Sequence, residues 1–471
     1  KFTQPFVVFF IFMAIIQLIA CKNVSNTNEE DEGYDEPEKA SQFQKLRTHD
    51  PVTGEVPSDR MWQAIVQTED IKIQLRNNAG FIAALSWQER GSNSDALGPS
   101  NGNTRANNGV TSGRIDAILV DAGDATGKTV WVGGRGGGLW KTTDITLSPA
   151  TWTPVNDFLS NLSISGITQD PTDPNIMYFC TGESFGEANA LRGNGVFKST
   201  DHGVTWTQLS STNNSNFYYC TRIICDYLGN IYVGTRTGLY RSTKASGGAA
   251  WTNITPSGAT SPRVCDLDIS TTSSAGRLHV VFGIFSTRSY FFTDIPVTVA
   301  AGTWTSPTSG FPAGSQRAEI GVSGNTLYCL PCTNTYQVST IYKSTDGGAT
   351  WATSGTPPQT ASSNPFANGQ GWYDLTVAIN PANANECIIG GIDNAKTING
   401  GTNWNRISDW VGTTGQYVHA DQHASVWYDN GNKFLFGCDG GIFYSADKGT
   451  TIRDRNVGLR LKQFYSVAIH P

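Results

Sequence analysis

The sequence has few charged residues and almost no methionine. Asp, Glu, Lys and Arg make up 15% of its 471 residues, well below the ~25% of a typical soluble domain. Methionine occurs three times. The net charge of −6 argues against nucleic acid as a partner, because phosphate backbones are bound by basic side chains. Glycine, with 51 residues, is abundant together with Ser, Thr, Asn and aromatic residues, a composition typical of an extracellular β protein.

An eight-residue phrase recurs along the sequence. STDHGVTW at residues 199–206 returns as STDGGATW at 344–351, and weaker copies follow at 397–404 and 445–452. The Asp can accept backbone N–H groups, the last Gly can adopt a positive φ and the Trp is a large apolar side chain, so the phrase predicts a tight turn followed by a core anchor. The anchors are spaced by about 50 residues, a period typical of propeller blades. They are Trp152, Trp206, Trp251, Trp304, Trp351, Trp404 and Ile452.

Each repeat also contains four short segments with strand-like patterns, and no helical periodicity interrupts them. The innermost segments are expected at residues 115–120, 162–168, 221–225, 264–269, 318–322, 373–379 and 421–427. The sequence therefore predicts an all-β fold, a β-propeller with about seven four-stranded blades and a short N-terminal helix before it. The segment around Trp87 has an anchor but no blade of its own, so we expect it to pair with residues 461–469 in an incomplete closing blade.

Several further phrases carry a family resemblance: GRIDAILVD, GGGLWKTTD, GQGWYDL, YVHADQHA, CDGGIFYS and LKQFYSVAIHP. With the repeated turn, they make the chain from about Trp87 onward resemble the Asp-box (BNR-repeat) β-propellers, among them sialidases, xyloglucanases and sortilin-type receptors, and especially surface propeller lipoproteins of Bacteroidetes. The resemblance implies a glycoside-hydrolase-like propeller that binds or cleaves extracellular polysaccharide. The alternative is a sortilin-like module that binds a protein ligand or mediates adhesion without catalysis. The Arg-Ile-Pro phrase of the sialidases is missing from this sequence.

The N-terminal region resembles a lipoprotein signal. Residues 6–20 are apolar, shorter than the ~20 residues needed to span a bilayer, and they end directly before Cys21. We expect Cys21 to be lipidated and to hold the protein at an outer membrane or cell surface, a plain secretory signal being the alternative. The predicted organisation is a signal peptide at 1–20, an acidic unfolded tether at 21–57, a helical lead-in at 58–84 and the propeller at 85–471.

Candidate catalytic groups are four carboxylates on the propeller face opposite the repeated turns: Asp374, Asp393, Asp421 and Asp439. If the turn of the sixth repeat spans 380–385, Asp374 and Asp393 are diagonal neighbours ~7 to 8 Å apart at Cα. Inverting glycosidases require carboxyl groups separated by ~6.5 to 9.5 Å, so this pair could serve as acid and base. Alternatively, both carboxylates cap loops and hold backbone amides.

The remaining candidates are ligand-binding and metal-binding side chains. In the HADQH phrase, His419, Asp421 and His423 would point the same way on a strand, which predicts either a divalent-metal site or a polar knot between blades. No other cofactor is indicated. Trp372 and Trp410 fall in loops where they could stack on sugar rings. The predicted ligand-binding residues are Arg135, Glu183, Arg192, Arg236, Trp372, Tyr373, Asn394, His419 and Trp410, and we expect one polar depression bordered by Trp372 and Tyr373.

Eight cysteines follow Cys21, and each lies in or beside a predicted strand. An even number in an exported protein permits disulfides, but a buried Cys also serves as a small apolar residue. The pair in CLPC at 329–332 has no second pair at zinc-site spacing, which argues against a metal knuckle there.

Replacing Cys21 with Ser tests the lipid anchor. Lipidation requires the thiol, so we expect the Cys21→Ser variant to be released in soluble form while the parent protein stays with the membrane fraction. Fractionation of cells expressing each form measures this, and retention of the variant in the membrane would contradict the assignment.

Overall fold

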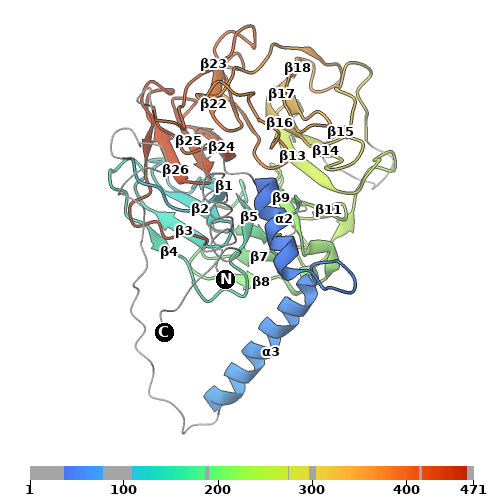
Figure 1. The fold of residues 1–471 in the computed structure, drawn as a ribbon, viewed down its shortest axis with the longest axis vertical. Helices are drawn as coiled ribbons and strands as arrows, with labels where there is room; N and C mark the ends of the chain where they lie inside the picture. Colours follow the sequence, from blue (N-terminus) through green and yellow to red (C-terminus); the bar gives the residue numbers. More distant parts are fainter. Residues whose placement is uncertain are drawn as a thin grey trace, which may run out of the picture.

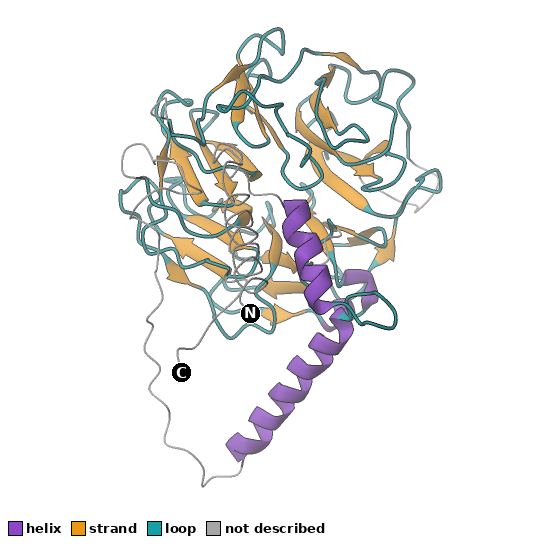
Figure 2. Cartoon of the chain, in the orientation of Figure 1, coloured by secondary structure: helices purple, strands orange, loops and turns teal. Residues whose placement is uncertain are grey.

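The repeats fold into seven antiparallel sheets arranged as a ring (Figures 1 and 2). The computed structural model describes residues 37–77, 109–185, 190–273, 275–295, 304–412 and 416–463. Within these residues the chain is a seven-bladed β-propeller, and each blade is formed by one continuous stretch of sequence, as predicted. The first strand of each blade contacts the first strands of its neighbours around the ring, so these seven strands surround the centre.

The first four blades follow one another from residue 115 to residue 294. Blade 1 contains β1 (Ile115–Val120), β2 (Val130–Gly134), β3 (Gly138–Thr142) and β4 (Thr153–Pro154). Blade 2 contains β5 (Ile164–Gln169), β6 (Met177–Thr181), β7 (Val196–Ser199) and β8 (Thr207–Gln208). Two short 3₁₀ helices (Ser210–Thr212 and Ser215–Phe217) lead to blade 3, which contains β9 (Cys220–Cys225), β10 (Ile231–Thr235), β11 (Leu239–Ser242) and β12 (Thr252–Asn253). Blade 4 contains β13 (Val264–Ser270), β14 (Arg277–Phe282) and β15 (Ser289–Asp294).

In blade 4, a β-bridge from Phe292 to Thr305 stands at the place of the fourth strand among the described residues. The last three blades are four-stranded. Blade 5 contains β16 (Ala318–Ser323), β17 (Thr326–Pro331), β18 (Tyr342–Ser344) and β19 (Ala352–Thr353). Blade 6 contains β20 (Thr376–Ile379), β21 (Cys387–Gly390), β22 (Asn394–Thr397) and β23 (Asn405–Arg406). Blade 7 contains β24 (Gln422–Tyr428), β25 (Lys433–Cys438), β26 (Gly441–Ser445) and β27 (Arg453–Asp454). The predicted inner strands are confirmed, except that β20 begins three residues later than expected.

Blade 7 contacts blade 1 and closes the ring. Strand β1 packs on β24 and β25, and Ile115 shares a buried cluster with Leu435 and Leu459. Leu461 continues onto blade 1, where a Cβ on Gly134 or Gly137 would overlap its side chain. The predicted closing partner, Trp87, and residues 464–469 lie outside the described residues, so the pairing with the closing blade stays a prediction.

The repeated phrase forms the predicted turn. Ser199 Oγ donates to Asp201 Oδ1 at 2.8 Å and accepts from the amide of Gly203 at 2.8 Å, while the amide of Thr205 donates to Asp201 Oδ1 at 2.9 Å. Gly203 has a φ of +77°, a conformation that disfavours residues with a Cβ. The copy at 344–351 repeats each of these bonds. The turn therefore joins the third strand to the fourth through one carboxylate and one hydroxyl.

The anchor after each turn packs on the preceding blade. Trp351 of blade 5 meets the ring of Tyr290 in blade 4 edge to face, with 5.4 Å between centroids. Trp206 of blade 2 lies 6.4 Å from Trp131 of blade 1 in the same arrangement, and Ile452 of blade 7 joins a cluster with residues of blade 6. The anchors thus hold neighbouring blades together.

Two helices precede the propeller. Helix α3 (Ser58–Asn77) lies within the range 58–84 predicted as a helical lead-in, of which residues 78–84 lie outside the described residues. It extends away from the blades in Figure 1. Helix α2 (Pro37–Thr48) lies within the range predicted to be an unfolded tether, so that prediction is wrong for these residues. The acidic residues are concentrated before the helix, whereas its own sequence contains Ala, Gln, Lys, Leu and Arg, which favour helix formation. Among the described residues, neither helix is long and apolar enough to cross a membrane.

Substituting Trp351 with Ala tests the inter-blade role of the anchor. The ring is 6% exposed, and removing a buried aromatic side chain typically lowers the free energy of unfolding by about 3–5 kcal/mol. Urea unfolding followed by far-UV circular dichroism measures this. The control is Val204→Ala in another copy of the turn, where the side chain is 77% exposed and the change should stay within about 0.5 kcal/mol. Equal effects of the two substitutions would contradict the anchor role.

Candidate functional site

Five of the inner strands contain a β-bulge near their first residue. In β1, Ile115 and Ala117 pair with consecutive residues of β2, which leaves Asp116 unpaired in the ladder, and His423 occupies the corresponding position in β24. A bulge turns the extra side chain away from the regular alternation of the strand. All five lie on the face opposite the repeated turns. The bulged residues are Asp116, Ser165, Thr221, Cys265 and His423.

Two arginines and two acids of blades 1 and 2 form a compact ion-pair network. Arg114 Nε lies 3.1 Å from Asp116 Oδ1, and its Nη2 lies 3.3 Å from Glu183 Oε1. Arg135 Nε lies 2.6 Å from Asp116 Oδ2 and 3.2 Å from Glu183 Oε1. Burial alone would raise the pKa of Asp116, but the two guanidinium groups hold it below its usual value. The predicted ligand-binding residues Arg135 and Glu183 are therefore part of this network, in which the positive charges of the arginines and the negative charges of the acids compensate each other.

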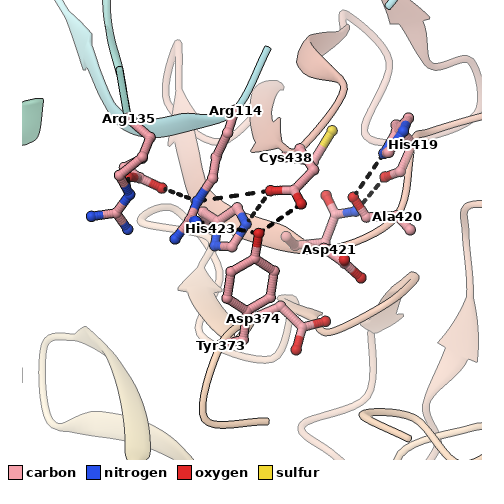
Figure 3. A network of polar contacts seen from close by, with 12 residues as sticks. Arg114, Arg135, Tyr373, Asp374, His419, Ala420, Asp421, His423 and Cys438 are labelled. Carbon is pink, nitrogen blue, oxygen red and sulfur yellow. Dashed lines mark hydrogen bonds and ion pairs between the residues drawn. The ribbon is translucent and has the colours of Figure 1, made fainter. Parts of the chain in front are cut away.

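The network continues to Asp439 in blade 7, whose Oδ1 lies 3.7 Å from Arg114 Nε. Figure 3 shows Arg114 close to Tyr373 and His423. The Tyr373 hydroxyl donates to Asp439 Oδ2 at 2.7 Å, and His423 Nε2 lies 2.7 Å from Asp439 Oδ1. The Arg114 guanidinium lies over the Tyr373 ring at 4.5 Å. Burial opposes ionisation of Asp439, yet His423 and Arg114 lower its pKa to about 2. Burial also lowers the pKa of His423. Asp439 is consequently ionised at neutral pH.

Asp374 and Asp421 meet through one amide. Gln370 Nε2 donates to Asp374 Oδ2 at 3.2 Å and to Asp421 Oδ1 at 2.5 Å. Asp374 has no solvent exposure, and burial raises its pKa well above the usual value. The structure thus brings three predicted carboxylates, Asp374, Asp421 and Asp439, into one buried polar region with Tyr373.

Asp393 has a different role. Its Oδ2 accepts the amide of Ala361 at 2.7 Å, and its Oδ1 accepts the amide of Trp410 at 2.9 Å and the Ser408 hydroxyl at 3.3 Å. These bonds join the loops on either side of blade 6. Burial raises the pKa of Asp393 to about 7. The carboxylate is a loop cap, which was the alternative interpretation of its sequence position.

The predicted pairing of Asp374 with Asp393 is wrong. The turn of blade 6 spans residues 380–386 instead of 380–385, so that Thr376 pairs with Gly390. A shift of one residue moves side chains to the opposite face of a strand. Asp374 therefore precedes β20 and faces Gln370, while Asp393 faces the loop amides.

The predicted metal site is not formed either. Asp421 has a φ of +67°, so the strand begins only at Gln422 and the expected alternation from His419 to His423 is broken. His419 Nδ1 lies 3.2 Å from the carbonyl of Ala420, and Figure 3 shows this ring apart from His423. Within the residues that the structure describes, no three His, Cys, Asp or Glu side chains are placed to hold a metal ion.

The aromatic and amide candidates are buried. Trp372 is 5% exposed and packs on Tyr373, while Trp410 is 4% exposed and packs on Ile392. Neither indole presents an open face for a sugar ring, so the prediction that they stack on sugars is wrong. Asn394 is also fully buried, at the first position of β22. The sequence showed that these residues lie in loops or at strand ends but contained no signal for how tightly the loops pack.

Two predicted arginines hold neighbouring segments. Arg236 donates to the backbone carbonyl of Glu183 at 2.7 Å. The Arg192 guanidinium lies between two rings, 4.6 Å from Trp62 of α3 and 3.6 Å from Tyr218. Arg192 therefore attaches the N-terminal helix to the face on which the inner strands begin. The eight cysteines after Cys21 are all free.

A second ion-pair network was missed by the sequence analysis. Arg222 donates to Asp266 Oδ1 at 3.1 Å and to Glu319 Oε1, and Arg317 lies 2.9 Å from Glu319 Oε2. Burial and the nearby Glu319 raise the pKa of Asp266 to about 7. The signal was a charged residue at the second or third position of otherwise apolar inner strands, as in VCDLDI and AEIGVS.

The face also carries cavities of very different size. Beside Asp116 and His423 the space is about 20 Å³, and the adjoining central channel, lined by Arg222 and Asp268, holds about 200 Å³. A pocket of about 430 Å³ lies at blades 4 and 5, between the segment that enters β16 and the loop from β17 to β18. Its walls are residues 312–315, 331–335, 339, 340 and 342 with Arg288.

Comparison with known proteins finds a relative in sequence and solved structures with a similar fold. No family model matches the sequence. A xyloglucanase of a Paenibacillus species is 25% identical over 252 residues, which are 46% of this chain and 22% of that protein. The GH74 xyloglucanase of Xanthomonas campestris superimposes with a TM-score of 0.52 and 19% identity, covering 72% of this chain and 52% of that one. The chain is a β-propeller similar to those of GH74 xyloglucanases.

This glycoside-hydrolase-like propeller spans about half of the Xanthomonas enzyme and under a quarter of the Paenibacillus protein. The extracellular domain of a putative one component system from B. thetaiotaomicron is also similar, with a TM-score of 0.48 and 11% identity over 71% of this chain and 38% of that one. Sequence identities this low support a shared propeller architecture only, so the chemistry of this chain has to be argued from its own residues.

Asp393 makes the stability of the propeller depend on pH. Its folded-state pKa of about 7 lies above the ordinary 3.8, so its contribution is complete below about pH 4 and is lost as pH rises through 7. We expect the urea unfolding midpoint of the Asp393→Asn variant to depend less on pH between pH 4 and 7 than that of the parent protein. The variant should also be less stable throughout, because the amide nitrogen cannot accept a backbone N–H. The exposed Asp157→Asn is the control, and an unchanged pH profile in Asp393→Asn would contradict the assignment.

Proposed function

We propose that the chain is an exported, surface-anchored propeller that binds extracellular polysaccharide on the face where the inner strands begin. The apolar segment 6–20 that ends before Cys21 supports export and a lipid anchor. The glycoside-hydrolase-like fold and the low charge of the chain support a saccharide as the ligand.

The size of the blade 4–5 pocket carries the proposal. Its volume of about 430 Å³ falls within the ~300–1,000 Å³ typical of ligand sites, whereas the 20 Å³ beside Asp116 and His423 has room for about one water. The pocket walls present hydroxyl and amide groups from Ser315, Asn334 and Thr335, which can exchange hydrogen bonds with sugar hydroxyls. Ligand binding is therefore favoured there, away from the ion-pair networks.

Hydrolysis is the second candidate, because two carboxylates of the buried region have pKa values moved in opposite directions. The pKa of Asp374 is raised by burial and that of Asp439 is lowered to about 2 against the effect of burial, a combination that can supply one protonated acid and one ionised base. However, Asp374 has no exposed surface, so a substrate oxygen would reach it only after Gln370 and its neighbours had moved.

One experiment separates the two candidates. The full-length protein is titrated with a panel of soluble polysaccharides, and the same mixtures are assayed for new reducing ends. We expect saturable binding of at least one polysaccharide, no reducing ends, and unchanged binding in Asp374→Asn and Asp439→Asn variants that remain folded. Release of reducing ends that both variants abolish would establish hydrolysis instead. Binding to no polysaccharide would overturn the proposal in favour of a protein ligand.

A further inference from the structure

The floor of the blade 4–5 pocket contains a buried guanidinium. Arg288, 7% exposed, follows the loop between β14 and β15. Its Nε donates to the carbonyl of Pro312 at 3.2 Å, its Nη2 to Ala313 at 3.1 Å, and its Nη1 to Arg317 at 3.1 Å and Cys332 at 3.4 Å. The side chain thereby fixes the two backbone segments that form the pocket walls.

Arg288 differs from other arginines of this face because it has no acidic partner among the residues that the structure describes. The other buried arginines of this face pair with carboxylates: Arg114, Arg135 and Arg317 each lie within 3.3 Å of one. By contrast, throughout the described parts of the chain Arg288 has no carboxylate partner, and no acidic residue lines the pocket. Carbonyl dipoles solvate the cation, but its full charge is left uncompensated in a poorly solvated place, which is costly unless an anion arrives.

These four hydrogen bonds use four of the five N–H groups of the guanidinium, and Nη2 carries the remaining one. This nitrogen lies against Gly314, where a Cβ would come within 3.1 Å of it. The glycine thus keeps the pocket open next to the cation. Hydroxyl and amide groups of Thr333, Asn334 and Ser339 line the same space.

Two aromatic residues are close in the chain to residues that line the pocket: Phe285 comes three residues before Arg288, and Tyr336 directly follows Thr335. We call this pair the aromatic rim. Phe285 is 40% exposed and meets the ring of Tyr336 edge to face at 6.3 Å. Both residues have positive φ, 56° and 57°, a conformation that is rare for aromatic residues and that clusters at binding sites. Thr287, two residues after Phe285, forms a β-bridge with the wall residue Ser315. The strained loop tips therefore hold an exposed ring beside the polar pocket.

From these contacts we infer that the pocket binds an acidic sugar, with the carboxylate of a uronic acid unit next to Arg288 and the adjoining sugar ring against Phe285. This inference deepens the proposed polysaccharide function and rests on it. A carboxylate accepts the remaining N–H of the guanidinium and neutralises its charge, while the wall hydroxyls bond the ring hydroxyls. Neutral saccharides lack the first of these interactions and bind more weakly.

A charge change in the wall tests the inference without altering Arg288. Ser339 lines the pocket and is exposed, so Ser339→Asp adds a negative charge there and Ser339→Asn is its neutral match in size. With isothermal titration calorimetry, short oligogalacturonates should bind the Ser339→Asp protein about tenfold more weakly than the parent, as expected for like charges in a partly screened site. The Ser339→Asn protein loses the same hydroxyl without gaining a charge, so it should bind oligogalacturonate more tightly than the Ser339→Asp protein, and the difference between the two variants isolates the effect of the charge.

Titrations with other ligands distinguish a failure of this inference from a failure of the proposed function. A neutral xyloglucan oligosaccharide should bind more weakly than oligogalacturonate and respond equally to both Ser339 variants. Tighter binding of the neutral ligand, or an equal effect of Asp and Asn on oligogalacturonate, would overturn the inference while polysaccharide binding stands. Binding of dextran sulfate without oligogalacturonate would overturn the uronate assignment. Binding of no saccharide at all would overturn the proposed function as well.

A substitution of Phe285 in the aromatic rim tests the inference independently of Ser339. Phe285→Ala removes a ring that is 40% exposed and packs on Tyr336 and Trp372, so circular dichroism first checks that the variant is folded. Loss of the stacking surface for a sugar ring should then weaken oligogalacturonate binding severalfold. The matched control is Phe158→Ala, where the ring is 95% exposed in blade 1, away from blades 4 and 5. Equal affinities of Phe285→Ala and the parent would remove the rim from the site.

Discussion

Packing of each blade against the one before it is the constraint on which the rest of this propeller depends. A four-stranded sheet buried on both faces has no stable existence alone, and here the outer anchor of every repeat supplies the contact with its neighbour, as Trp351 does on Tyr290. The contacts run around the ring until blade 7 meets blade 1 through Ile115 and Leu435. The apolar clusters lie mainly between blades, and in the central channel charged side chains such as Asp116, Arg222 and Asp268 are interspersed with apolar residues of the inner strands.

That division explains why so many charges can lie near the axis. Arg114, Asp116, Glu183 and Asp439 belong to three blades and are adjacent only after the ring has closed. Removing one partner would leave a buried charge without compensation, which is far more costly than the pair is favourable. The proposed ligand surface lies away from these networks, at the loops of blades 4 and 5, where Arg288 has only carbonyl partners among the described residues.

The repeat made the architecture predictable, since the turn phrase encodes both a local bond pattern and the spacing of the blades. Strand positions followed from the alternation of apolar residues. Side-chain neighbours did not, because they depend on single-residue details: the longer turn at 380–386 moved Asp374 away from Asp393, and the positive φ of Asp421 separated His419 from His423. Burial of Trp372 and Trp410 depends on loop packing across blades, for which one sequence carries no periodic signal. The helix at Pro37–Thr48 was concealed by the acidic stretch before it.

Because of the bulges, side chains of the inner strands can change in chemical character while the hydrogen-bonded pairing of the strands stays the same. Each extra residue stands outside the ladder, so its side chain can change while the hydrogen bonds on either side keep their register. The five positions now hold an acid, two hydroxyls, a thiol and an imidazole at Asp116, Ser165, Thr221, Cys265 and His423. The strand pairing of the inner strands is thus fixed separately from these five side chains. A change at one of them would leave the strands in register and would have to be compensated only by its side-chain partners, such as Arg114 for Asp116 or Asp439 for His423.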